Sequence, residues 1–144
     1  MPDKHVAVVG AGLVGSLMAV YLARRGYQVS VFERRPDMRV KSFDGGRSIN
    51  LALSNRGIKA LEEVGAASEI QRIAIPMHGR MIHAIDTSLT FQPYGKDGQY
   101  INSISRGSLN ILLMNMAEQQ GVKFFFDNRI THVDLVKTSV ISEI

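Results

Sequence analysis

The first 33 residues constrain the fold more than any other part of the chain. An apolar run over His5–Val9 leads into the glycine-rich segment Gly10-Ala11-Gly12-Leu13-Val14-Gly15. A helix-patterned segment then extends to Gly26, and a second apolar run over 28–33 ends in Glu33. Strand, glycine turn, helix, strand and terminal acid, in this order and spacing, predict a βαβ unit that binds a dinucleotide.

The glycines of the turn have separate roles in such a unit. Gly10 permits a tight exit from the strand, Gly12 lets a pyrophosphate approach the backbone, and Gly15 lets the helix pack closely on the strand. The N-terminus of the helix offers N–H groups and partial positive charge to phosphates. A glycine-rich turn without a ligand is the alternative, and it leaves the acid at the strand end unexplained.

The acid at the end of the second strand narrows the choice of dinucleotide. Glu33 lies 18 residues after Gly15 and can accept hydrogen bonds from both ribose hydroxyls of an adenosine. A carboxylate at this place disfavours the 2′-phosphate of NADP. FAD and NAD both remain open on this fingerprint alone.

The composition excludes several other classes of protein. The chain has 144 residues, of which 45% are hydrophobic and 21% charged, which suits one soluble domain with a core. The absence of cysteine excludes disulfides, thiolate metal sites and cysteine nucleophiles, and fits a cytoplasmic protein. The net charge of +4 comes from scattered Lys and Arg, so we expect no nucleic-acid partner. No apolar run approaches the roughly 18 residues of a membrane span, so we expect no membrane segment.

Apolar periodicity and turn residues predict the remaining elements. We expect helices over 13–25, 55–64 and 105–120, strands over 49–53, 77–85, 89–92, 100–105, 122–126 and 130–136, and loops over 35–48 and 93–98. The strand over 5–9 should be buried, and Ser54 should cap the second helix. The first helix should bury one apolar face, formed by Leu13, Leu17, Val20, Tyr21 and Ala23. His78 and His83 fall on opposite faces of a predicted strand, so we expect no metal site.

The middle of the chain favours FAD over NAD. The segment Gly46–Gly57 follows the second strand at the point where an NAD dehydrogenase would continue with a helix. In the aromatic-ring hydroxylases that use FAD, a loop here leads into a short segment and then a helix that begins with a small polar residue. Arg106 opens the third predicted helix, where that class places an arginine against FAD. Taken alone, Arg106 could also be a surface arginine at a helix start.

Four segments together carry a closer resemblance. Gly46–Gly57, Ile75–His83, Pro93-Tyr94-Gly95 and Ser105-Arg106 with Leu109-Asn110 resemble the kynurenine 3-monooxygenase family of FAD-dependent aromatic-ring hydroxylases, up to about Val136. The resemblance implies an α/β fold with a Rossmann-like FAD-binding domain, three-layered with a parallel sheet. It also implies that 1–144 are the N-terminal FAD-binding portion of a longer flavoprotein, with 74–105 as a β insertion on the substrate side. The unclosed strand pattern over 138–144 fits that expectation.

The resemblance assigns roles residue by residue. FAD contacts fall on Gly10, Gly12, Val14, Gly15, Phe32, Glu33, Arg34, Arg35, Ala52, Arg106 and Ile130. The substrate carboxylate falls to Arg80, with Tyr94 donating its hydroxyl to the same group. A guanidinium suits this role because it binds a carboxylate through two parallel hydrogen bonds. Without the surrounding motif, Arg80 and Tyr94 would be an exposed strand arginine and a loop aromatic. No residue is identified as a catalytic acid or base.

The resemblance implies NADPH-consuming hydroxylation of L-kynurenine to 3-hydroxykynurenine with O₂, a step of tryptophan catabolism and NAD biosynthesis. We expect the 144-residue chain to be inactive by itself. One alternative is another FAD-dependent monooxygenase or reductase of the same fold, which would have no use for Arg80 and Tyr94. The other is a non-catalytic dinucleotide-binding module.

Overall fold

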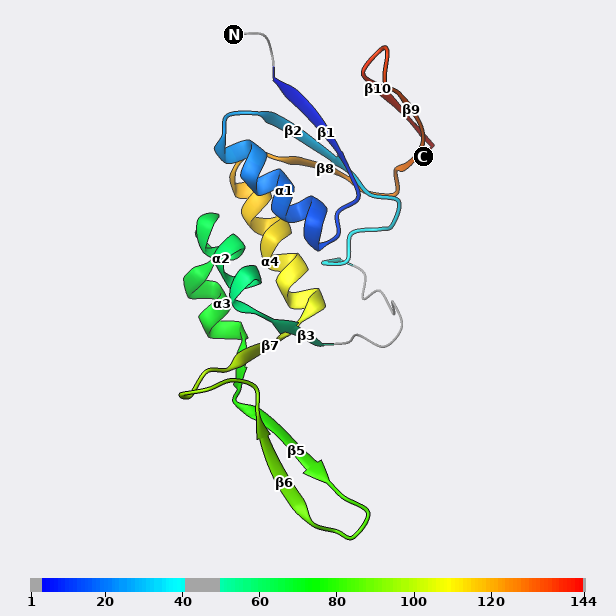
Figure 1. Ribbon diagram of the computed structural model, residues 1–144. Coiled ribbons are helices and arrows are strands. Elements are labelled where there is room, and N and C mark those ends of the chain that lie inside the picture. The colour runs from blue at the N-terminus through cyan, green and yellow to red at the C-terminus, as the bar shows by residue number, and fades with distance from the viewer. Residues whose placement is uncertain (1–3, 41–49, 144) are drawn as a thin grey trace. The chain divides into compact units, whose positions relative to one another are not determined.

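The computed structural model describes residues 4–40 and 50–143. The chain divides into two compact units (Figure 1). Unit 1 comprises residues 1–47 and 107–144, and unit 2 comprises residues 48–106. The predicted loop positions 41–48, together with Ile49, lie outside the described residues.

Unit 1 is built on a parallel sheet with the strand order β1-β2-β8. β1 (His5–Val9) and β2 (Gln28–Phe32) pair in parallel and are joined by α1 (Leu13–Arg24). β8 (Lys123–Phe125) pairs in parallel with the other edge of β2. The predicted βαβ unit is therefore confirmed, and Glu33 directly follows β2.

The buried side of α1 agrees with the predicted apolar face at Val20 and differs from it elsewhere. Its buried residues are Ser16, Ala19 and Val20, whereas Leu13 and Leu17 stay half-exposed. A Cβ added at Gly15 would collide with the carbonyl oxygen of the residue that begins the turn, Gly10. The helix therefore approaches the strand so closely that small side chains, rather than large apolar ones, face inward.

The prediction that β1 is buried is wrong. In the described sheet β1 lies at an edge, and the side chain of Val9 is 57% exposed. The middle strand β2 carries the buried positions instead, with Val31 fully buried. A middle strand is covered by neighbouring strands on both sides, whereas an edge strand has a neighbour on one side only.

Unit 1 continues with a long helix and a hairpin. α4 (Arg106–Gln119) buries Leu109, Asn110, Leu113, Met114 and Ala117, and the chain turns at Gly121 with a φ of +84°. β9 (Arg129–Asp134) and β10 (Ser139–Glu143) then form an antiparallel pair. The predicted strands over 122–126 and 130–136 and the strand start at 138–144 are confirmed with shorter bounds.

Unit 2 contains an antiparallel sheet with the order β3-β7-β4. These strands are Asn50–Leu53, Ile101–Ser105 and Ile75–Met77. The predicted second helix is confirmed as α2 (Asn55–Glu63), although the side chain of Ser54 makes no capping hydrogen bond. The buried apolar residues of this unit are Leu53, Leu61, Val64, Ala66, Ile70 and Ile104.

A short helix, α3 (Ala67–Ile73), was not predicted from the sequence. Its seven residues are too few to be stable by intrinsic propensity, so packing must hold it. Ile70 is 4% exposed and supplies that packing. A single buried residue in so short a segment gives no readable helical period.

The predicted strand pair over 77–85 and 89–92 is confirmed as the hairpin β5 (Gly79–His83) and β6 (Leu89–Pro93). Its turn is held by Asp86, whose Oδ1 accepts from the backbone N and the hydroxyl of Ser88 at 3.0 and 2.7 Å. Nearly every residue of the hairpin is exposed. Among the described residues, each helix is too short or too polar to cross a membrane.

Candidate dinucleotide site

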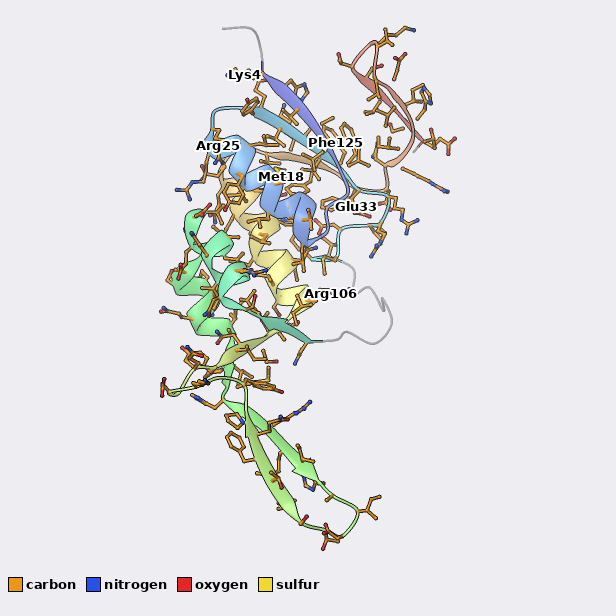
Figure 2. The ribbon with its side chains drawn as sticks, viewed as in Figure 1. Lys4, Met18, Arg25, Glu33, Arg106 and Phe125 are labelled. Carbon is orange, nitrogen blue, oxygen red and sulfur yellow. The ribbon has the colours of Figure 1, made fainter. Side chains whose placement is uncertain are left out.

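The glycine turn is fastened to the end of β2. Gly10 N donates to the carbonyl oxygen of Phe32 at 2.7 Å, and Ala11 N donates to Oε2 of Glu33 at 2.9 Å. The second carboxylate oxygen of Glu33 accepts from the backbone N of Arg35 at 3.0 Å. The Glu33 side chain thus stands at the end of β2, between the turn and the chain that follows (Figure 2).

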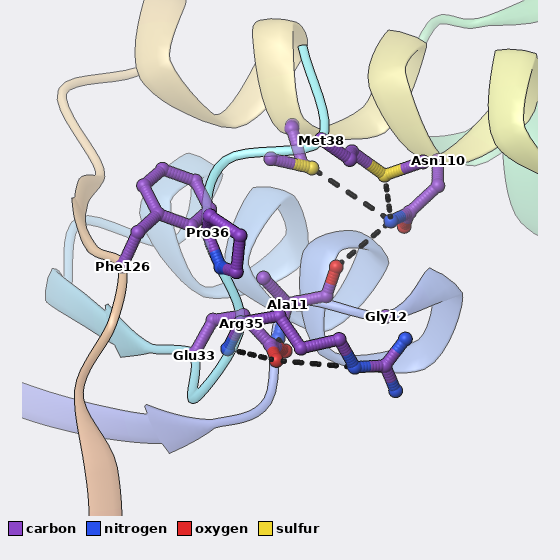
Figure 3. A pocket seen from close by; sticks show the side chains of 9 residues that line it. Ala11, Gly12, Glu33, Arg35, Pro36, Met38, Asn110 and Phe126 are labelled. Carbon is purple, nitrogen blue, oxygen red and sulfur yellow. Dashed lines mark hydrogen bonds and ion pairs between the residues drawn. The ribbon is translucent and has the colours of Figure 1, made fainter. Parts of the chain in front are cut away.

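The carbonyl of the same alanine is also held by side chains. Ala11 O accepts from Asn110 Nδ2 at 2.9 Å and from the hydroxyl of Ser16 at 3.2 Å. Figure 3 shows the Asn110 side chain reaching from α4 toward the turn. All three residues are buried, at 5% exposure for Ala11, 8% for Asn110 and 0% for Ser16. The turn is therefore fixed at both the N–H and the C=O of Ala11.

A cavity of about 100 Å³ lies beside the turn, entirely within unit 1 (Figure 3). Its walls combine a carboxylate, a guanidinium, thioethers and an aromatic ring, and the residues are Ala11, Gly12, Glu33, Arg35, Pro36, Met38, Asn110, Met114 and Phe126. A Cβ added at Gly12 would meet nothing within 4 Å, so the backbone there is open to a ligand. A carboxylate for a ribose, an uncovered backbone for phosphates and apolar walls for a base fit a dinucleotide such as FAD.

An ion-pair network holds the chain segment that forms one wall of this cavity. Arg39 pairs with Asp37 at 2.7 Å and with Glu118 of α4 at 2.6 Å. Hydrogen bonds from Arg39 keep the pKa of the Asp37 carboxyl below its usual 3.8. The hydrogen bonds to Glu118 and Asp37 raise the pKa of Arg39. The network ties the segment that contains Pro36 and Met38 to α4.

The other predicted FAD contacts of unit 1 lie on three elements. Val14, in the first turn of α1, is 79% exposed, which is unusual for valine and leaves it available to a ligand. The ring of Phe32 stacks on that of Phe125 at 5.1 Å. Arg34 is exposed beyond β2, and Ile130 is half-buried on β9. The structure brings the turn, Glu33 and Arg35 together around one cavity but leaves Ile130 on a separate hairpin.

Of the predicted FAD contacts of unit 2, one lies on a strand and the other directly follows the neighbouring strand. Ala52 is on β3 and is exposed, with Ser103 of β7 as its cross-strand partner. Arg106 directly follows β7, begins α4 and is also exposed (Figure 2).

The two predicted substrate residues share one face of the hairpin. Arg80 pairs with Gln92 across the strands, and Tyr94 N donates to the carbonyl oxygen of His78 at 3.0 Å, which extends the same register. Because side chains alternate along a strand, Arg80, Gln92 and Tyr94 point to the same side. The Nε of Arg80 donates to Oε1 of Gln92 at 2.7 Å.

Sequence analysis assigned no role to Gln92 or Ser16 and used Asn110 only as part of a motif. The alternating pattern over 77–92 predicted the strand pair but not its register, which is what places Gln92 opposite Arg80. Asn110 is 99 residues from its partner Ala11, so no local pattern could have joined them.

Fold and site together define an α/β dinucleotide-binding unit. A family model described as an FAD binding domain matches residues 3–143, and the chain belongs to this family. FAD rather than NAD is therefore the dinucleotide, as the sequence predicted, and the expected FAD-binding fold with a parallel sheet is confirmed.

Relatives with curated names support the resemblance found in the sequence. The chain is 59% identical over 131 residues to a kynurenine 3-monooxygenase of Myxococcus xanthus strain DK1622, covering 90% of this chain and 28% of that protein. It is 50% identical over 133 residues to a kynurenine 3-monooxygenase of Christiangramia forsetii, covering 92% of this chain and 30% of that protein. The chain thus spans less than a third of the length of these relatives.

Solved structures share the fold. The oxygenase of 2-methyl-3-hydroxypyridine-5-carboxylic acid, in its tetrameric form, superposes with a TM-score of 0.79 at 19% identity, covering 99% of this chain and 38% of that one. The p-nitrophenol 4-monooxygenase PnpA of Pseudomonas putida DLL-E4 gives a TM-score of 0.73 at 18% identity, covering 92% and 33%. At such identities the likeness concerns the fold.

Proposed function

We propose that this chain provides the FAD-binding part of an NADPH-consuming aromatic hydroxylase that converts L-kynurenine and O₂ to 3-hydroxykynurenine. The observation that carries the proposal is the 59% identity, over 90% of the chain, to a relative named for that activity. The stretch 74–105, which includes the β5–β6 hairpin, is proposed as the insertion on the substrate side. A cytoplasmic location is proposed with it.

The residues of this chain bind and orient the cofactor. When bound, FAD supplies the redox chemistry, accepting electrons from NADPH and passing them to O₂. Gly10, Gly12 and Gly15 shape the turn that receives the pyrophosphate, and Glu33 accepts from the ribose hydroxyls. Further proposed contacts, carried over from the family resemblance, are Val14, Phe32, Arg34, Arg35, Ala52, Arg106 and Ile130.

The hairpin residues orient the amino-acid end of the substrate. Gln92 accepts from Nε of Arg80, which leaves the two terminal guanidinium nitrogens to donate in parallel to a carboxylate. Tyr94, on the same face, donates its hydroxyl to the same group. Fixing the carboxylate in this way limits the orientations of the aromatic ring.

The test is the substitution Arg80→Ala in the full-length gene product. A charge-assisted bidentate contact contributes about 2 kcal/mol, so the Kd for kynurenine should rise about thirtyfold. The Kd for FAD, followed by flavin fluorescence, should not change. Arg72→Ala is the matched control, because Arg72 is an exposed arginine of the same unit whose partner is Glu69.

Three results would contradict parts of the proposal. Unchanged kynurenine affinity in the Arg80→Ala variant would remove Arg80 from the substrate site. A yellow protein whose NADPH oxidation does not respond to kynurenine would indicate another FAD-dependent monooxygenase or reductase. A protein that binds FAD and oxidises no NADPH with any aromatic substrate would indicate a binding module.

A further inference from the structure

Asn110 occupies a buried position at which a polar side chain has a cost. Its amide nitrogen donates to Ala11 O at 2.9 Å and lies 3.2 Å from the sulfur of Met38. Its Oδ1 is buried and has no hydrogen-bond partner within the described part of the chain. An unsatisfied buried acceptor is unfavourable, and a leucine of similar size would avoid the penalty. The benefit of asparagine here must come from its donor.

The donor acts on one particular peptide plane. The carbonyl of Ala11 and the N–H of Gly12 belong to the same planar, trans peptide group, so they point in opposite directions. Asn110 and Ser16 hold the carbonyl toward the buried side of the turn. The N–H of Gly12 must then face away from the side on which Asn110 and Ser16 lie. Gly12 is itself exposed, and a Cβ added to it would meet nothing within 4 Å, so the residue is accessible to a ligand.

We propose that Asn110 is a positioning residue for the phosphate-binding turn: by holding Ala11 O from α4, it aims the Gly12 N–H at the dinucleotide pyrophosphate. The inference rests on FAD binding at this turn and goes beyond it, because Asn110 acts from a different element of the chain and need not touch the cofactor. Ser16 assists from α1 through a longer bond of 3.2 Å. Glu33 holds the other side of the same residue, at Ala11 N.

The asparagine amide also has the orientation that this role requires. Only Nδ2 can donate to a carbonyl, and a flipped amide would place Oδ1 against Ala11 O, acceptor against acceptor. Asp in place of Asn keeps the shape but has no donor when ionised. Leu keeps the volume and removes both the donor and the orphaned Oδ1.

The experiment compares ligands with and without phosphates on the full-length gene product, stripped of cofactor. The affinities of ADP and adenosine are measured by displacement of FAD for the parent and for Asn110→Leu, Asn110→Asp and Ser16→Ala. Asn115→Leu is the matched control, because Asn115 lies on the same helix and bonds Arg39 rather than the turn. Thermal unfolding without ligand is measured in parallel.

We expect Asn110→Leu to weaken ADP and FAD about tenfold, the value of one hydrogen bond, and to change adenosine affinity less than twofold. Asn110→Asp should have a larger effect of the same kind, and Ser16→Ala a smaller one. The unfolding temperature of Asn110→Leu should stay equal to that of the parent or rise. This combination of lost phosphate affinity and retained stability is not expected of a merely structural residue.

Two results would overturn the inference about Asn110 and leave the proposed FAD site standing. The first is an unchanged ratio of ADP to adenosine affinity in Asn110→Leu, with the parent binding FAD normally. The second is an equal loss of both ligands together with lower stability, which would make Asn110 a packing residue. If the parent binds neither FAD nor ADP, the proposed FAD site fails as well. Asn110→Asp keeps the test decisive if the leucine variant does not fold.

Discussion

The glycine turn of unit 1 and the β5–β6 hairpin of unit 2 differ in how far their polar groups are buried and in which contacts hold those groups in place. At the turn, Ala11 is 5% exposed and its contact with Asn110 joins residues 99 apart in sequence. On the hairpin, Tyr94 is 44% exposed and the bond from Arg80 to Gln92 joins adjacent strands. The turn is fixed by several elements, and the hairpin face by its own two strands.

This difference indicates how the two regions tolerate change. A buried, multiply bonded peptide has essentially one arrangement, and Gly15, which packs against the turn, cannot grow without a collision. Exposed side chains on a hairpin retain rotamer freedom, so one can be replaced without disturbing the fold. Substitutions at the turn should therefore alter stability or cofactor binding, whereas those on the hairpin should alter substrate affinity alone.

The largest effect is expected from Gly15→Ala, which tests the tightness of the turn. The new Cβ would collide with the carbonyl oxygen of Gly10, a backbone atom that cannot move aside. The free energy of unfolding should fall by about 3 kcal/mol, measured by urea denaturation. A variant as stable as the parent would show that the helix and strand are not in close contact.

Gly12→Ala separates folding from binding within the same turn. Its Cβ would meet no atom within 4 Å, and the φ of −76° suits alanine, so stability should be unchanged. The methyl group would stand where the pyrophosphate approaches the backbone, so FAD should bind about thirtyfold more weakly, or ~2 kcal/mol. Normal FAD affinity, measured by flavin fluorescence titration, would place the pyrophosphate elsewhere.

Gln92→Leu tests the hairpin, and we expect a smaller effect there. Without the acceptor at Nε, the Arg80 guanidinium loses its orientation, so the KM for kynurenine should rise about fivefold, or ~1 kcal/mol. The kcat, the FAD affinity and the stability should stay constant in steady-state kinetics and unfolding. Thr90→Ala, on the same face of the hairpin, is the control. If Gln92→Leu lowered the free energy of unfolding as much as Gly15→Ala does, the hairpin and the glycine turn would not differ in how they tolerate substitution.

The smallest effects on stability are expected at two carboxylates. Asp37 lies in the segment that forms one wall of the cavity, and Asp86 lies in the turn of the hairpin. Because Arg39 holds the pKa of Asp37 below 3.8, this pair stabilises the fold above about pH 4 and loses its effect as the pH falls through the lowered pKa. Asp37→Asn should cost up to ~1 kcal/mol at pH 7, and the difference from the parent should shrink toward pH 3. Hydrogen bonds from Ser88 also lower the pKa of Asp86 in the exposed hairpin turn, so Asp86→Asn should change the pH dependence of urea unfolding in the same direction but by less, because solvent screens an exposed group. If the difference in free energy of unfolding between Asp37→Asn and the parent stayed constant from pH 7 to pH 3, the titration of Asp37 would not contribute to stability.

Features that depend on residues close together in the sequence were predicted correctly, whereas features that depend on packing between distant residues were not. The βαβ unit, the stops at Gly26 and Gly121, and the paired strands of the hairpin depend on neighbouring residues and were predicted. The helix α3 was missed, because packing of Ile70 rather than an intrinsic helical pattern holds it. The buried face of α1 was predicted correctly at Val20, but Ser16 and Ala19 were missed, because the closeness of helix to strand favours small residues over leucines there.

The sequence by itself determined the glycine turn and the acid after the second strand, since these are set by the spacing of a few residue types along a continuous segment. The choice of FAD over NAD also came from the sequence, but from later segments and the family resemblance that they carry. The tertiary structure alone decided which groups hold that turn and which residue faces Arg80. Asn110 meets Ala11 and Gln92 meets Arg80 through helix packing and strand register. Such contacts depend on where distant segments come together in space, and local spacing does not encode that.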